Sequence, residues 1–173
     1  GDYIAAHKEC CTFVNIVYGV QVKQEADIVI ASCGGYPKDI NVYQLQKTMD
    51  NAWCAVREGG VVIILGECAE GSGSEMYEKT MEKYRTPAEV EAAIRADFQI
   101  GAHKAYAVTR LMKKADFVLV SSMKPELAEL LLFTPASDLA TAMQVACTKL
   151  GVEKPGITLM PMGSLTVPQI SAE

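Results

Sequence analysis

Short apolar runs alternate with amphipathic stretches along the chain, and this pattern predicts strands that alternate with helices. The runs at 27–33, 61–66, 117–121 and 157–160 predict strands. The unbroken aliphatic run at 61–65 indicates a strand buried on both faces, as in a parallel sheet. The chain is therefore predicted to be an α/β protein: a three-layer sandwich with a mostly parallel, Rossmann-like sheet flanked by helices.

Helical periodicity occupies the intervals between these strands. We expect helices over 2–18, 40–56, 75–84, 87–97 and 136–150, and shorter helices after Gly101 and at Pro125. An edge strand is expected at 19–23, and 161–168 is predicted to be a loop. The apolar residues of 2–18 can share one broad face, so we expect that helix to pack on the domain. A length of 173 residues predicts one domain spanning 1–173.

Composition narrows the classes of partner. Half of the residues are hydrophobic, 21% are charged, and the net charge of −5 comes without a basic stripe, which disfavours nucleic-acid binding. No apolar run approaches the ~18 residues of a membrane span, and no signal peptide begins the chain, so we expect no membrane partner and a cytoplasmic location. The chain lacks an initiator Met, and we expect it to be one domain of a longer protein.

The six cysteines form no CxxC pair, and most sit in apolar runs, which predicts reduced, buried thiols in a cytosolic protein. His7, Cys10 and Cys11 fall at i, i+3 and i+4 of the first helix and are neighbours there. One interpretation is a packed helix with a surface-facing or hydrogen-bonded histidine. The other is a metal or substrate site, because one imidazole and two thiolates can bind zinc or copper.

The stretch 33–47 is the principal candidate site, because open α/β sheets bind ligands at the carboxyl ends of their strands. Gly34 and Gly35 permit unusual φ values and close approach of a ligand to the backbone. Asp39 or Asn41 can cap the helix that follows. The sequence thus predicts a strand–turn–helix junction whose free backbone N–H groups can hold a small anion.

Three side chains on that helix can project together. Tyr43 and Gln44 lie four and three residues before Lys47, so all three can face one side. A lysine near a helix N-terminus is unfavourable with the helix dipole unless it meets an anion. A carboxylate ligand fits this set, with Lys47 supplying charge and the other two supplying hydrogen bonds. The alternative is that Lys47 is solvated and Tyr43 packs on the sheet.

Two other features are weaker candidates. The loop 71–75 could hold a phosphate or ribose, or it could be a flexible turn, since it matches neither GxGxxG nor a P-loop. His103 lies at a predicted helix start, where backbone donors favour a neutral imidazole suited to hydrogen bonding. The alternative for His103 is a partly exposed residue of the cap region.

Residues 27–47 resemble the signature of the nickel-dependent lactate racemase family, centred on the string GGYPKDIN-x-YQ-x-QK at 34–47. The resemblance continues through 67–71 and 101–106. It implies that this chain is the C-terminal domain of a two-domain isomerase, a 2-hydroxyacid racemase or epimerase. Such enzymes use a nickel pincer nucleotide, with hydride removal from the substrate's α-carbon and its return.

The resemblance also implies how the site is divided between the domains. The nickel ligand, the cofactor-anchoring lysine and the catalytic histidines belong to the N-terminal domain, so no catalytic residue or metal ligand is expected here, and the isolated domain should be inactive. Substrate-binding roles fall on the residues that match the family motif, Tyr43, Gln44 and Lys47, and on His103. Gly34 and Gly35 are expected to face the cofactor. The implied partners are a small 2-hydroxy acid and the chain's own N-terminal domain.

Two other functions stay open on the sequence. One is a Rossmann-like nucleotide- or phosphate-binding module without catalysis, using the loops 34–41 and 71–75. The other is a non-catalytic regulatory or scaffolding relative.

Overall fold

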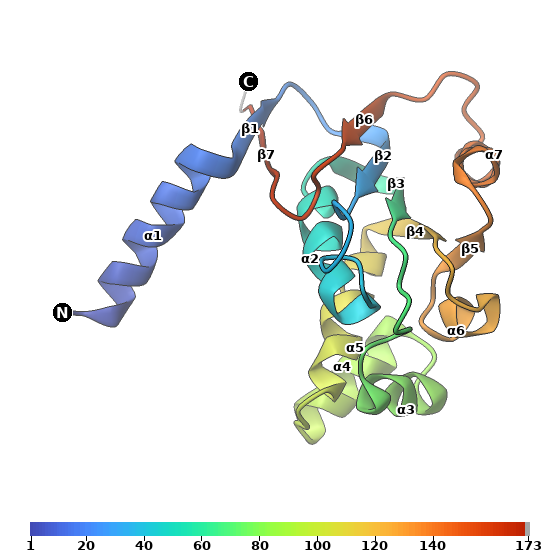
Figure 1. Cartoon of the computed structure of the whole chain (residues 1–173), viewed down its shortest axis with the longest axis horizontal. Coiled ribbons are helices and arrows are strands. Elements are labelled where there is room, and N and C mark those ends of the chain that lie inside the picture. The colour runs from blue at the N-terminus through green and yellow to red at the C-terminus, as the bar shows by residue number, and fades with distance from the viewer. Residues whose placement is uncertain (172–173) are drawn as a thin grey trace.

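The computed structural model describes residues 1–171, in which a parallel sheet lies between layers of helices (Figure 1). The elements in chain order are α1 (Tyr3–Tyr18), β1 (Gly19–Val22), β2 (Ala26–Ser32), α2 (Val42–Trp53), β3 (Val56–Leu65), α3 (Glu75–Lys83), α4 (Pro87–Ala96), α5 (Ala102–Thr109), the 3-10 helix η1 (Leu111–Lys113), β4 (Ala115–Val120), α6 (Pro125–Leu130), β5 (Thr134–Ala136), α7 (Leu139–Leu150), β6 (Ile157–Met160) and β7 (Val167–Ile170). No described helix is long and apolar enough to cross a membrane.

Five strands form the central sheet in the order β5-β4-β3-β2-β6, and every neighbouring pair is parallel. The predicted α/β fold is therefore confirmed. Side chains of β2 alternate between two cores: Val29 and Ala31 belong to one, and Ile28 to the other. Burial on both faces explains the unbroken apolar run at 61–65 in the central strand β3.

Helices cover both faces of this sheet, as the predicted three-layer architecture requires. α2 packs on β2 and β3 from one side, and α3, α4 and α5 extend that layer beyond α2 (Figure 1). α7 packs on β3, β4 and β5 from the other side through its buried Ala142 and Ala146. Small side chains on α7 let its backbone approach the sheet closely.

Asp27 joins three strands at the amino end of the sheet. Its carboxylate accepts a hydrogen bond from Arg57 Nε of β3 at 2.6 Å and from the Gly156 N–H before β6 at 2.7 Å. These bonds, led by that of Arg57, hold the pKa of Asp27 below its ordinary value. The ionised Asp27 carboxylate thereby links β2 to β3 and to the residue before β6.

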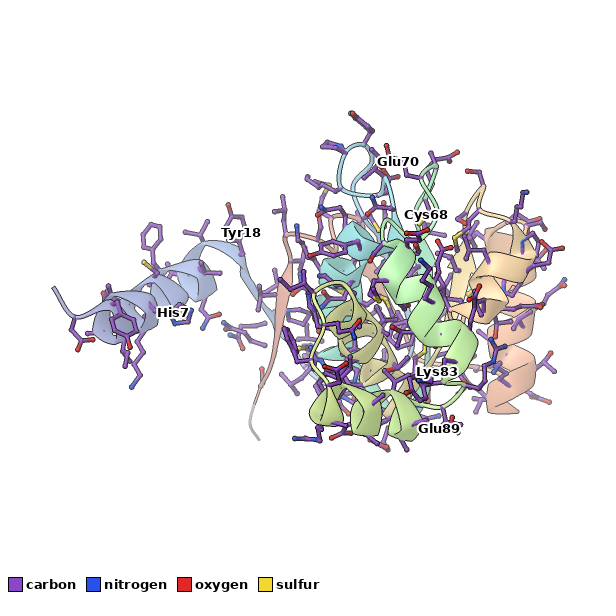
Figure 2. The ribbon with its side chains drawn as sticks, turned by 90° about the horizontal axis from the view of Figure 1, so that it is seen from below. His7, Tyr18, Cys68, Glu70, Lys83 and Glu89 are labelled. Atoms are coloured by element: carbon purple, nitrogen blue, oxygen red, sulfur yellow. The ribbon has the colours of Figure 1, made fainter. Side chains whose placement is uncertain are left out.

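The first helix forms as predicted, but it does not pack on the domain. α1 projects away from the body, and none of its residues is buried (Figure 1). Figure 2 shows His7 on the free part of this helix and Tyr18 where it rejoins the body. The prediction of a packed helix was wrong because periodicity identifies an apolar face without identifying what covers it.

Two further predictions needed correction. The tail 161–168, predicted as a loop, runs into β7, which pairs with β1 from the far end of the chain. Of the cysteines, which are all free, Cys33 and Cys68 are buried, but Cys10 and Cys11 are exposed on α1. Their burial was predicted from apolar neighbours, and those neighbours are themselves exposed.

Candidate functional site

The sheet has a topological switch point between β2 and β6. From β2 the chain passes through α2 to β3 on one side, whereas β6, which follows α7 on the opposite face, lies on the other side. In open α/β sheets the crevice outside the carboxyl ends of such strands is the usual ligand site. Here that crevice lies between the loop 33–41 after β2 and the loop 161–166 after β6.

Hydrogen bonds fasten the two loops together. The Gly163 N–H donates to the Ser32 carbonyl at 2.8 Å, and Ser164 Oγ donates to the Cys33 carbonyl at 2.8 Å. Asn51 of α2 donates through Nδ2 to the Gly163 carbonyl at 2.7 Å. The crevice therefore has walls held by backbone contacts, and side chains that project into it are presented from fixed positions.

A pocket of about 220 Å³ opens at this switch point, lined by Lys38, Gln44, Lys47, Ser164 and Leu165. Its polar groups are two ammonium groups, an amide and a hydroxyl, and no carboxylate lines it. Such a set is suited to a small anion, because charge-assisted hydrogen bonds from ammonium groups are stronger than neutral ones.

The backbone donors at the start of α2 are already used within the chain. Asn41 caps the helix by accepting from the Gln44 N–H at 3.1 Å, and the Val42 and Tyr43 N–H groups donate to the carbonyls of Gly71 and Ser72 at 3.0 Å. Of the two predicted caps, Asp39 and Asn41, the structure has Asn41. The expectation of free N–H groups was wrong for the start of α2, so these groups are not available to an anion.

Lys47 and Gln44 meet on the exposed side of α2. Lys47 Nζ donates to Gln44 Oε1 at 2.6 Å, and Lys47 forms no ion pair within residues 1–171. Because the amide oxygen accepts from the ammonium group, the Gln44 NH₂ group is left to donate to a ligand. The two side chains were expected to project to one side of the helix, and in the structure they are in direct contact.

Tyr43 lies between α2 and α5 rather than against the sheet. The ammonium group of Lys104 stands 4.0 Å above the centre of the Tyr43 ring, and the same group donates to Gln46 Oε1 at 2.8 Å. Burial and repulsion from Lys47 lower the pKa of Lys104, and Asp50 opposes this effect. A cation–π contact of this kind holds the Tyr43 ring beside α5, and Tyr43 does not line the switch-point pocket.

His103 lies at the first turn of α5, as predicted, and faces the same cluster. Its ring meets Tyr43 edge-on with ring centres 6.4 Å apart, and it stacks on Phe98 at 6.0 Å. The Gly101 N–H donates to His103 Nδ1 at 3.0 Å. Nδ1 must be unprotonated to accept that bond, so the ring proton of the neutral imidazole is on Nε2.

Gly34 and Gly35 both have positive φ, at 88° and 76°, which only glycine adopts readily. A Cβ on Gly34 would stand 3.3 Å from Met162 Cε and 3.6 Å from Lys38 Nζ. A Cβ on Gly35 would meet nothing within 4 Å, so the backbone there is open to a ligand. The two glycines thus differ: a side chain at Gly34 would crowd Met162, whereas the space beside Gly35 is open.

Two other candidate features lie outside the crevice. In the loop 71–75, Ser72 Oγ donates to Glu78 Oε1 at 2.5 Å and Ser74 caps α3, so these hydroxyls are engaged within the chain. On α1, His7 contacts Cys11 Sγ at 3.7 Å, but within residues 1–171 no three His, Cys, Asp or Glu side chains gather in a way that could hold a metal ion. Neither feature adds a binding site to the crevice.

Sequence reasoning missed Lys38, Ser164 and Lys104. Ser164 follows the last strand of the parallel sheet, and carboxyl ends of parallel strands share one edge, so the loop 161–166 was the available signal. For Lys104 the signal was its place beside His103. No comparable signal marked Lys38, whose direction depends on how the glycine turn folds.

Comparison with known proteins defines the family. A family model described as the lactate racemase C-terminal domain matches residues 21–167. The chain belongs to the lactate racemase family. It is 35% identical over 146 residues to the lactate racemase of Thermoanaerobacterium thermosaccharolyticum, covering 82% of this chain and 34% of that protein. It is 37% identical over 89 residues to the lactate racemase of Lactiplantibacillus plantarum, covering 51% of this chain and 21% of that protein.

Solved structures extend the family match to three dimensions. The lactate racemase apoprotein from T. thermosaccharolyticum superposes with a TM-score of 0.87 at 31% identity, over 95% of this chain and 40% of that one. A Thermotoga maritima protein of 10% identity, with a TM-score of 0.61, shares the fold alone. The chain therefore corresponds to the C-terminal part of lactate racemases and spans well under half of their length.

Proposed function

We propose that this chain is the substrate-binding domain of a nickel pincer nucleotide-dependent 2-hydroxyacid racemase or epimerase, active as part of a longer protein. The observation that carries the proposal is the switch-point pocket, in which Lys47 and Gln44 meet at an anion-suited crevice. The family membership places that pocket in a chain related to lactate racemases.

Each site residue has a role that its contacts support. Lys47 pairs with the substrate carboxylate, and Gln44, whose oxygen Lys47 occupies, donates its NH₂ group to the substrate. Tyr43, held under the Lys104 ammonium group, does not line the pocket itself, and its proposed role is to flank the substrate from the same turns of α2 that carry Gln44 and Lys47. His103, with its proton on Nε2, donates a hydrogen bond from the edge of the site.

The cofactor and catalytic acid–base groups would come from an N-terminal domain. When bound, the cofactor supplies hydride chemistry at the α-carbon of the substrate. This chain offers it the open backbone at Gly35 and leaves the pocket facing outward. The same domain would cover apolar side chains exposed on α1, including Phe13 (66% exposed) and Ile16 (74%). Free thiols at all six cysteines fit a reducing compartment, and we place the protein in the cytoplasm.

The proposal is tested with the full-length protein loaded with the nickel cofactor. A panel of enantiopure 2-hydroxy acids is incubated with it, and the appearance of the opposite stereoisomer is followed by chiral chromatography. One acid should be scrambled at its α-carbon, and Lys47→Ala should lose most of that activity. Full turnover of the true substrate by Lys47→Ala would remove the proposed role of this lysine.

The alternative, a nucleotide- or phosphate-binding module, has less support. The hydroxyl groups of Ser72 and Ser74 in one of its loops, and the first N–H groups of α2 after the other, are engaged within the chain. Calorimetry with NAD, ATP and sugar phosphates separates the two functions. Binding of any of these by the chain, with no effect of a 2-hydroxy acid, would favour the alternative.

A further inference from the structure

Lys38 is an unassigned cation in the switch-point pocket. It follows the glycine turn, is half-buried, and lines the pocket together with Lys47, Gln44 and Ser164. Neither lysine of the pocket forms an ion pair in the described part of the chain, although the protein carries 21 acidic residues against 16 basic ones. The pocket thus has two lysines and no carboxylate among its lining residues, and this set suits an added negative charge.

The turn positions Lys38. Its N–H donates to the Gly35 carbonyl at 2.9 Å, which closes the turn. Its ammonium group then lies back over Gly34, 3.6 Å from the place that a Cβ would take. A Cβ at Gly34 would crowd Met162 Cε at 3.3 Å, whereas its distance to Lys38 Nζ is that of an ordinary contact. The ammonium group of Lys38 therefore lies beside Gly34, and Lys38 lines the pocket together with Gln44 and Lys47 of α2.

The size of the pocket limits the ligand. About 220 Å³ is below the roughly 300–1,000 Å³ of pockets that bind drug-sized ligands, and this volume fits a small acid. Ser164 adds a hydroxyl, whose own proton goes to the Cys33 carbonyl, so its oxygen is left to accept from a ligand hydroxyl. A carboxylate beside a hydroxyl group matches these donors and this acceptor.

We propose that Lys38 is a second carboxylate-binding residue, which holds the substrate carboxylate together with Lys47 while Ser164 accepts a hydrogen bond from a substrate hydroxyl. The inference rests on the proposed function and deepens it, because it identifies the ligand of the pocket as a small 2-hydroxy carboxylate bound by two lysines. Two ammonium groups also fix the orientation of the carboxylate plane more closely than one.

Lysine acetylation of the full-length apoprotein tests this without any turnover. N-hydroxysuccinimidyl acetate is applied with and without L- or D-lactate or a longer 2-hydroxy acid, and each lysine is quantified by mass spectrometry. At a ligand concentration about four times the dissociation constant, acetylation of both Lys38 and Lys47 should slow about fivefold. The exposed Lys154 should not change. Protection of Lys47 alone, or protection of Lys38 only by inorganic phosphate, would overturn the inference.

Variants of the full-length protein loaded with the nickel cofactor provide a second test of the role of Lys38. Lys38→Met should lower kcat/KM by about 10- to 100-fold, as expected for a lost charge-assisted bond, while Lys38→Arg and the control Lys154→Met stay near wild type. Thermal melts confirm that Lys38→Met is folded. If Lys47→Met loses activity and Lys38→Met keeps it, this inference fails and the proposed function stands. If no 2-hydroxy acid is turned over and neither lysine is protected, the proposed function itself fails.

Discussion

The bond between Lys47 and Gln44 makes a quantitative prediction about coupled variants. Lys47→Met removes the ammonium group and also releases the Gln44 amide, whose oxygen it holds at 2.6 Å. The first effect should cost about 2–3 kcal/mol of transition-state binding, the range for a hydrogen bond to a charged group. That is roughly a 30- to 150-fold loss in kcat/KM. Gln44→Met should cost about 1–1.5 kcal/mol, close to tenfold.

The double variant is the informative one. If Lys47 orients Gln44, part of the transition-state binding that Gln44→Met removes is already lost in Lys47→Met. The double variant should then lose about 1 kcal/mol less than the sum of the two single variants. The assay is kcat/KM for racemisation by the full-length, cofactor-loaded protein, with Lys154→Met as the matched control for loss of one exposed lysine. Losses that add to within about 0.3–0.5 kcal/mol would show that the two side chains act independently and would refute the orienting role.

Three further predictions follow from residues that do not line the pocket. Burial raises the pKa of Cys33 to about 11 and that of Cys68 to about 12, so Ellman's reagent at neutral pH should reach these thiols only after denaturation, whereas the exposed thiols of α1 react at once. Asp27→Asn should lower the free energy of unfolding by about 1 kcal/mol. Because the folded pKa of Asp27 is depressed, the difference from wild type should be full above about pH 4 and vanish as pH falls through the folded value. Lys104→Met should release the Tyr43 ring, which raises KM more than it lowers kcat and is visible in Tyr43 ring NMR signals.

The parts of the fold that were predictable are those governed by local chemistry. The strand 27–33, the cap at Asn41 and the start of α2 follow from an apolar run, a glycine turn and a capping side chain that act within a few residues of each other. The unbroken apolar run 61–65 also predicted a parallel sheet, because a strand with one solvated face would alternate apolar and polar residues.

The parts that failed depend on groups far apart in the chain. β7 exists because Val167–Ile170 pairs with Gly19–Val22, about 150 residues earlier, and no local pattern reports such a pairing. The N–H groups at the start of α2 donate to the carbonyls of Gly71 and Ser72. These carbonyls lie about 30 residues later, and local sequence patterns do not predict contacts over that separation. The exposed position of α1 was not predictable for a similar reason, because an apolar helix face does not indicate which surface covers it.

The same distinction applies to the candidate site: residues close together in the sequence were predicted, and residues from distant segments were not. Tyr43, Gln44 and Lys47 share one helix, so their spacing placed them together, and the structure adds that Lys47 bonds to Gln44. Lys38, Ser164 and Lys104 enter from a turn, a distant loop and another helix, and only the sheet order brings them to α2. A pocket at a switch point is a property of topology, and topology was predicted only as far as its class.

The most direct measurement is the fate of the α-hydrogen during isomerisation. The full-length protein, loaded with the nickel cofactor, is incubated in D₂O with a panel of enantiopure 2-hydroxy acids, and products are analysed by chiral chromatography and mass spectrometry. We predict that one acid yields its opposite stereoisomer with the original hydrogen retained at the α-carbon, and that Lys47→Met and Lys38→Met suppress this reaction. Absence of inversion for every acid tested, or inversion with deuterium incorporated at the α-carbon, would contradict the proposed function.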